Sequence, residues 1–98
     1  MAQFQVGQVI HHKRYDYRGV VAKADDSCGA PDDWYLGNQT QPKRDQPWYH
    51  VLVHGGAETY VAEDNLEADL TGDEIAHPYV DRMFSMFLKG RYYRFCPN

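Results

Sequence analysis

The clearest alternation of apolar and polar positions lies in the middle of the chain. Residues 48–54 are rich in β-branched and aromatic side chains, which predicts a strand, and residues 57–62 predict a second one. Gly55 and Gly56 separate the two runs, and glycine adopts the positive φ angles that tight hairpin turns require. This part of the sequence therefore predicts a β-hairpin.

A second hairpin is expected nearer the amino terminus. Residues 4–13 predict a strand, and residues 19–23 predict its partner. The short polar segment between them, residues 14–18, is typical of a turn. After the central hairpin, residues 63–66 predict a short turn that places Leu66 in the core, and an acidic connector follows.

Between the two hairpins, residues 24–47 show neither helical nor strand periodicity. The segment holds five glycine and proline residues among clustered Asp, Asn and Gln. A loop longer than about 12–15 residues is uncommon in a compact domain and is usually mobile or functional. We therefore expect a long loop, with Trp34, Tyr35 and Leu36 pinning its middle to the sheet.

The last apolar pattern has a helical period. Apolar residues recur at positions i, i+3, i+4, i+7 and i+8, namely Val80, Met83, Phe84, Phe87 and Leu88. Pro78 suits the first position of a helix, and Gly90 suits its end. The pattern predicts a helix over residues 77–89, and residues 91–95 predict a last strand or an extended segment.

Together these elements predict a mainly-β chain that forms a single domain, residues 1–98. The expected architecture is a small, partly open β-barrel of about five strands with a long loop and one C-terminal α-helix. Leu, Ile, Val and Phe are sparse, so the core depends on aromatic rings. The chain has two Trp, eight Tyr and four Phe, and each such ring can bury roughly 150–250 Å².

The sequence points to no membrane or secretory segment. No apolar run approaches the ~20 residues of a membrane span, and the amino terminus lacks the charged-then-apolar pattern of a signal peptide. We therefore expect no membrane partner and a cytoplasmic location, with association with the nucleoid as one alternative. The two cysteines, Cys28 and Cys96, are expected to be reduced.

Motifs for catalysis or for metal binding are absent from the sequence. His50 and His54 would lie on one strand face, but about 13 Å apart, which is too far to hold one ion. The sequence shows no nucleophile motif and no phosphate-binding glycine loop. These observations predict a non-enzymatic binding module with no metal and no cofactor.

Charge is distributed unevenly along the chain. Ten Lys and Arg against fourteen Asp and Glu give a net charge of −4, which disfavours a bulk polyanion binder. Residues 1–24 nevertheless carry four cations and one acid, residues 25–88 three cations and thirteen acids, and residues 89–98 three cations and no acid. If the two basic ends share one face, their cations and tyrosines could hold phosphates and stack on bases. Alternatively, these cations neutralise the acidic middle within the fold.

Four motifs carry a family resemblance. They are Phe4-x-Val6-Gly7-x-x-Ile10-x-His12, Tyr17-x-Gly19-Val20-Val21, Gln46-Pro47-Trp48-Tyr49-His50-Val51-Leu52-Val53 and Tyr60-Val61-Ala62-Glu63-x-Asn65-Leu66. In this order, over residues 4–67, they resemble the YccV-like family, the hemimethylated-DNA-binding or heat-shock protein Q family. The segment around Trp34 and the tail from Ile75 to Phe87 look more like the domain at the carboxyl end of F-box-only proteins.

The resemblance implies a fold, an activity and partners. It implies an SH3-like β-barrel that binds hemimethylated duplex DNA and has no catalytic residues. For the heat-shock members it implies a part in protein quality control as a regulator of a cytosolic protease. A protein-interaction adaptor that contacts a protease or its substrates is therefore the alternative function, and self-association of the chain stays open.

The candidate binding residues are the cations and histidines of the basic ends and the aromatic or polar-tipped family positions. They are His11, His12, Lys13, Arg14, Tyr17, Arg18, Trp48, His50, Arg91 and Arg94.

Overall fold

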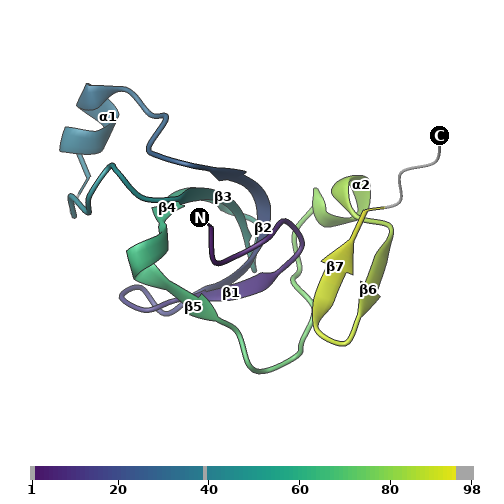
Figure 1. Cartoon of the computed structure of the whole chain (residues 1–98). Helices are drawn as coiled ribbons and strands as arrows, with labels where there is room; N and C mark the ends of the chain where they lie inside the picture. The colour runs from purple at the N-terminus through teal and green to yellow at the C-terminus, as the bar shows by residue number, and fades with distance from the viewer. Residues whose placement is uncertain (1, 39, 95–98) are drawn as a thin grey trace.

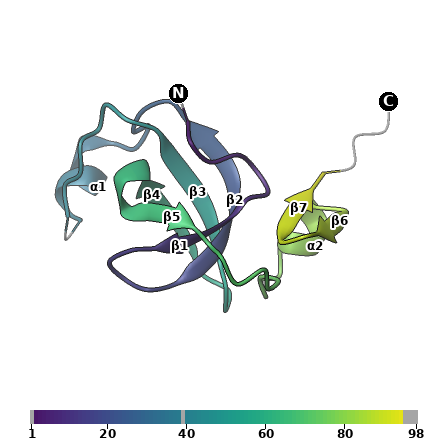
Figure 2. The same cartoon turned by 60° about the horizontal axis from the view of Figure 1, so that its bottom comes forward.

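The computed structural model describes residues 2–38 and 40–94, and its main element is a curled antiparallel sheet (Figure 1). The strands are β1 (Val9–His12), β2 (Arg18–Asp25), β3 (Trp48–Val53), β4 (Glu58–Ala62) and β5 (Leu66–Ala68). Their order is β4-β3-β2-β1-β5, so β4 and β5 are the two edges. The mainly-β prediction is confirmed. The sheet curls without closing into a barrel (Figure 2), and the SH3-like description stays a prediction.

Both predicted hairpins are present. β1 pairs with β2, and β3 pairs with β4. The first strand is shorter than predicted, because the chain turns before it: the Gln8 N–H donates to the Gln5 carbonyl at 3.0 Å, and Gly7 has a φ of 94°. The turn predicted over residues 63–66 is a 3₁₀ helix, η1 (Glu63–Asn65), and Leu66 is buried as expected.

The central strands of the sheet are buried on both faces. Alternate strand residues supply two hydrophobic clusters, since successive side chains of a strand point to opposite faces. The inner cluster is built around Ile10, Val21 and Tyr49. The outer cluster joins Val20 and Leu52 to residues of the C-terminal segment.

The predicted C-terminal helix over residues 77–89 is wrong beyond its first turn. The helix α2 spans only Val80–Met83, and a hairpin of β6 (Met86–Leu88) and β7 (Arg91–Tyr93) follows. Lys89 and Gly90 both have positive φ, at 52° and 77°, as a two-residue hairpin turn requires. A short apolar run fits helical and strand periods alike, and here the turn at Lys89 and Gly90 favours the hairpin over a continuous helix.

The last-strand alternative for residues 91–95 is confirmed over β7, and residue 95 lies outside the described residues.

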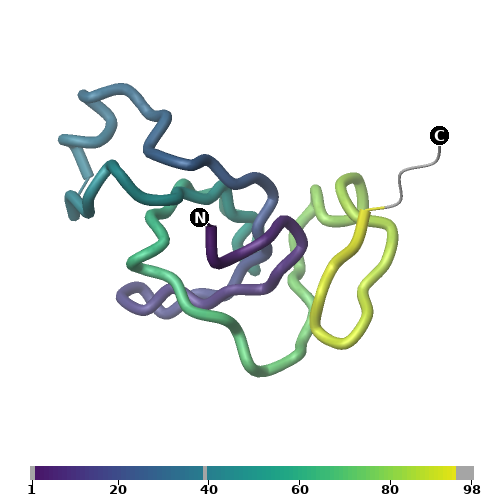
Figure 3. The backbone as a smooth tube through the Cα atoms, in the orientation of Figure 1, coloured from purple at the N-terminus to yellow at the C-terminus, as the bar shows by residue number. Residues whose placement is uncertain are grey.

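The long segment between β2 and β3 carries a short helix, α1 (Asp32–Leu36), and stands away from the sheet (Figure 3). Trp34 packs edge-on against Trp48 at 6.2 Å between ring centroids, and Tyr35 contacts the same ring at 6.3 Å. These two residues pin the segment as predicted. Leu36 does not, because it is 68% exposed.

Two further expectations concern cysteines and the membrane. Cys28 is a half-buried free thiol, as expected, and Cys96 lies outside the described residues. Within the part of the chain that the structure describes, no helix is long and apolar enough to cross a membrane.

Gly7 provides a test of how the C-terminal segment attaches. A Cβ at Gly7 would overlap the carbonyl oxygen of Tyr92, whereas a Cβ at Gly55 would meet no atom within 4 Å, although both residues have positive φ. Gly55→Ala should lower the free energy of unfolding by roughly 1–3 kcal/mol from backbone strain alone. Gly7→Ala should lower it by about 2 kcal/mol more. Urea denaturation of both variants measures this, and equal losses would show that the close approach to Tyr92 is unimportant.

Candidate nucleic-acid interface

The turn between β1 and β2 forms a basic projection at one end of the sheet. We call residues 13–16 the hairpin tip. The His12 N–H donates to the Tyr17 carbonyl at 2.8 Å, and the Asp16 N–H donates to the His12 carbonyl at 3.0 Å. Asp16 has a φ of 57°, a conformation that Asp tolerates better than most residues. The chain therefore reverses within a few residues and exposes the side chains of the tip.

The side chain of His12 supports the backbone of the hairpin tip. Its side chain is buried, and its Nδ1 accepts the backbone N–H groups of Arg14 at 3.1 Å and Tyr15 at 3.0 Å. Its ring lies 4.7 Å from that of Tyr15 and 4.9 Å from that of Tyr17. Burial, with the neighbouring positive charges of His11 and Arg14, lowers the pKa of His12. His12 is thus a neutral structural residue rather than a phosphate ligand.

His11 has the opposite electrostatic environment. Its Nε2 lies 2.6 Å from an Asp16 carboxylate oxygen, and its Nδ1 lies 2.7 Å from one of Glu67. The hydrogen bond to Asp16, followed by that to Glu67, raises the pKa of His11. The positive charge of His11 is therefore paired with two carboxylates of the same chain, and these ion pairs join the hairpin tip to β5.

Three side chains of the tip remain directed to solvent. Lys13 and Arg14 are exposed, and neither takes part in an ion pair within residues 2–38 and 40–94. The Lys13 Nζ donates only to the Asp64 carbonyl at 3.3 Å, and the Arg14 guanidinium lies 5.9 Å from the Tyr15 ring centroid. Tyr15 is 48% exposed. The tip therefore combines two available cations with an accessible aromatic ring.

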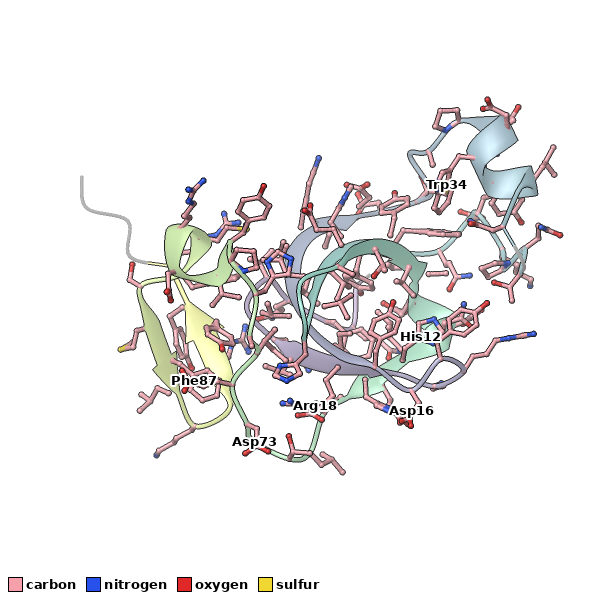
Figure 4. All side chains as sticks on the ribbon, turned by 180° about the vertical axis from the view of Figure 1, so that it is seen from behind. His12, Asp16, Arg18, Trp34, Asp73 and Phe87 are labelled. Atoms are coloured by element: carbon pink, nitrogen blue, oxygen red, sulfur yellow. The ribbon has the colours of Figure 1, made fainter. Side chains whose placement is uncertain are left out.

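Arg18, another candidate, has a structural role. Its Nη2 donates to a carboxylate oxygen of Asp69 at 3.0 Å and to the Asp73 carbonyl at 2.6 Å, which ties β2 to the acidic connector (Figure 4). Burial opposes ionisation of Asp69, but hydrogen bonds from Arg18 and Thr71 hold its pKa below the usual value. The guanidinium is thus neutralised within the fold.

Trp48 and His50 belong to a different region, an aromatic cluster where α1 meets β3 and β4. Trp48 is buried, and the His50 ring lies 4.5 Å from the Tyr60 ring. The Tyr60 hydroxyl donates to an Asp25 carboxylate oxygen at 2.7 Å and accepts the Gly29 N–H at 2.9 Å. The hydrogen bond from the Tyr60 hydroxyl lowers the pKa of Asp25. Burial, followed by the hydrogen bond to the Asp25 carboxylate, raises the pKa of Tyr60 to about 12. This pair, which closes the long loop, has no sequence signal, because its two residues are 35 positions apart.

Tyr17 is half-buried beside the hairpin tip. Its hydroxyl lies 2.9 Å from the Thr59 hydroxyl, and burial raises its pKa. This contact joins the end of the first hairpin to β4.

The basic residues at the carboxyl end lie away from the hairpin tip. The Arg91 Nη2 donates to the Gln5 side-chain carbonyl at 2.6 Å, and the Arg94 Nη2 donates to the Ala22 carbonyl at 3.1 Å. The β6–β7 hairpin and the β1–β2 turn occupy opposite ends of the molecule in Figures 1 and 2. The structure therefore does not combine the two basic ends in one patch. Within the described residues, no group of three His, Cys, Asp or Glu side chains could hold a metal ion.

Comparison with known proteins identifies similar sequences. A family model described as "Hemimethylated DNA-binding protein YccV like" matches residues 2–91. The F-box only protein 21 of Mus musculus is 37% identical over 92 residues, and those of Homo sapiens and Pongo abelii are 36% identical over the same length. The alignments cover 91% of this chain but 15% of each relative, so the chain spans only a small part of the length of these relatives.

The two neighbouring histidines should titrate on opposite sides of 6.5, the ordinary imidazole pKa. A proton-detected NMR titration should find His11 above this value and His12 below it. The contribution of His11 to stability is full below pH 6.5 and is lost as the pH rises through its raised pKa. That of His12 is present above pH 6.5 and is lost as the pH falls through its lowered pKa.

A matched variant separates the two histidines. Glu67→Gln should lower the pKa of His11 and change that of His12 much less, because only His11 contacts Glu67 and His12 responds only through the charge of His11. Equal pKa values of the His11 and His12 rings in the parent chain would contradict the two environments described for these histidines.

Proposed function

This chain belongs to the YccV-like family, described as hemimethylated-DNA-binding, and from that membership we propose that it is a non-enzymatic module that binds hemimethylated duplex DNA through its hairpin tip. The resemblance seen in the motifs of residues 4–67 is thereby confirmed, and it extends to residue 91. The observation that carries the proposed location is the adjacency of Lys13 and Arg14, exposed and outside the ion pairs of the described residues.

The shape of the tip suits the major groove of DNA. That groove is wide enough to admit a two-stranded β-ribbon. In the proposed complex Lys13 and Arg14 contact phosphates on the groove edges, and the Tyr15 ring lies toward the bases. The major groove presents apolar methyl groups of bases as well as hydrogen-bonding edges, so an exposed ring there can distinguish methylated from unmethylated strands.

The remaining candidates support the tip rather than contact the phosphates. His12 stays neutral and fixes the backbone of Arg14 and Tyr15, while His11 joins the tip to β5. A rigid tip loses less conformational entropy when it binds. The overall charge of −4 restricts the contact to this local cationic surface.

The heat-shock part of the alternative role, regulation of a cytosolic protease, gains no support from the similar proteins, whereas a protein-interaction adaptor is compatible with the F-box only proteins among them. The adaptor role stays a prediction, as do self-association and the cytoplasmic location.

An electrophoretic titration tests DNA binding. One duplex is prepared unmethylated, hemimethylated and fully methylated, and binding is followed as salt is raised. Two phosphate contacts predict a slope of about −2 in the plot of log affinity against log salt concentration. The double variant Lys13→Ala/Arg14→Ala should bind weakly and with a slope reduced by about two.

The matched control removes the same charge from the other end of the molecule. Arg91→Ala/Arg94→Ala should retain the affinity and salt slope of the parent chain. Negligible binding of all three duplexes would exclude the proposed activity. Loss of binding only in the control variant would move the interface to the carboxyl end.

A further inference from the structure

The edge strand β4 has free hydrogen-bonding groups along its outer side. The Val53 N–H donates to the Ala57 carbonyl at 2.8 Å, and the Glu63 N–H donates to the Pro47 carbonyl at 2.9 Å. Hydrogen-bonded pairs alternate with non-bonded pairs in an antiparallel ladder. With the observed β3–β4 register, Thr59 and Val61 therefore pair with β3.

The backbone N–H and C=O groups of Glu58 and Tyr60, and the N–H of Ala62, point away from β3. The Ala62 C=O is used by the 3₁₀ helix η1, of which Ala62 is the N-cap. Within residues 2–38 and 40–94 the other outward groups have no partner among the backbone bonds of turns and loops or among the side chains. β4 thus presents a template for one more strand.

The other edge of the sheet is protected. β5 has only three residues, and the exposed Glu67 at its centre is held in an ion pair with His11. Short edge strands and charged residues are the usual means by which proteins prevent edge pairing. β4 has five residues, contains no proline, and has its single charge, Glu58, at its start. The two edges therefore differ, and only β4 is open to an additional strand.

A groove of about 900 Å³ follows this open edge. All five residues of β4 line it, which places the groove along the strand and around both of its faces. Trp34 and Pro42 of the long segment line it, as do Tyr15 and Tyr17 of the first hairpin. Glu58 and Arg82 are the only Lys, Arg, Asp or Glu residues among the described groove-lining side chains. A nearly neutral aromatic groove suits an uncharged polypeptide and disfavours a polyanion.

We propose that β4 binds an extended peptide as a sixth strand of the sheet. The peptide bonds through its main chain to Glu58, Tyr60 and Ala62, as in recognition by strand addition. Its alternate side chains contact Tyr60 and Trp34 on one face and Tyr17 on the other. The preferred sequence is therefore uncharged, with apolar or aromatic side chains that alternate between the two faces.

A single strand fits this site better than a second copy of the chain. The walls formed by the long segment and the first hairpin lie along the groove on each copy. A second copy that paired through its own β4 would place two sets of these side chains along one shared edge, whereas a single strand has no such side chains beside it. This peptide site does not depend on the proposed DNA binding.

Amide hydrogen exchange of the full chain tests the site directly. The probe is a blocked peptide of about six residues, the length of a common strand, with threonine and valine alternating around a central tyrosine. At saturation it should slow exchange at Glu58, Tyr60 and Ala62 by about tenfold or more. Thr59 and Val61 already pair with β3 and should change little. The control peptide has the same side chains but N-methyl groups on the amides that face β4.

Two proline variants give a matched comparison of the edges. Glu58→Pro removes one outward N–H of β4 and should weaken peptide binding about fivefold, the effect of one backbone hydrogen bond. Ala68→Pro removes an outward N–H of β5 and should leave it unchanged. Lys13→Ala/Arg14→Ala should also bind the peptide normally.

Three results would overturn the proposal. The first is unchanged exchange at Tyr60 and Ala62 at saturating probe, or equal protection by the N-methylated peptide. The second is protection that depends on protein concentration alone, which would identify a second copy as the occupant. The third is protection by duplex DNA, which would assign the groove to nucleic acid.

Discussion

The attachment of the C-terminal segment to the outer face of the sheet depends on Tyr92. Its N–H donates to the Gly7 carbonyl at 2.8 Å, and its hydroxyl accepts the Ile75 N–H at 2.8 Å. Its ring lies 5.4 Å from Phe84 and 4.6 Å from Phe87. One residue, through its backbone N–H and its side chain, thus joins the amino-terminal turn, the acidic connector and the last hairpin. Because the chain has few aliphatic residues, loss of this contact would expose the outer face of the central strands.

Three polar pairs likewise connect distant segments in the rest of the molecule. Asp69 neutralises Arg18, Asp25 holds Tyr60, and Glu67 holds His11. Each pair joins segments far apart in the sequence. The acidic middle of the chain therefore serves partly as a set of internal partners for cations and phenols, as the neutralisation alternative for the charges anticipated. Lys13 and Arg14 take part in no ion pair within residues 2–38 and 40–94, and in the proposed complex they contact the phosphates of DNA.

The central hairpins could be predicted from the sequence because their alternation and glycine positions are local signals. The C-terminal hairpin could not, since the spacing of its apolar residues also fits a helix, and the positive φ of Lys89 has no sequence signature. The hairpin tip was predictable because its residues are consecutive. The structural use of Arg18 was not predictable, because its partner Asp69 is 51 residues away.

The aromatic cluster at α1 has a spectroscopic consequence. The chain has two tryptophans, Trp34 and Trp48, and both lie in this cluster, 6.2 Å apart. Trp34 is partly exposed and Trp48 is buried, so their fluorescence emission reports on the same junction from one solvent-exposed and one buried position. Intrinsic fluorescence thus follows detachment of the long loop from the sheet, and it does so without a label and at a distance from the hairpin tip.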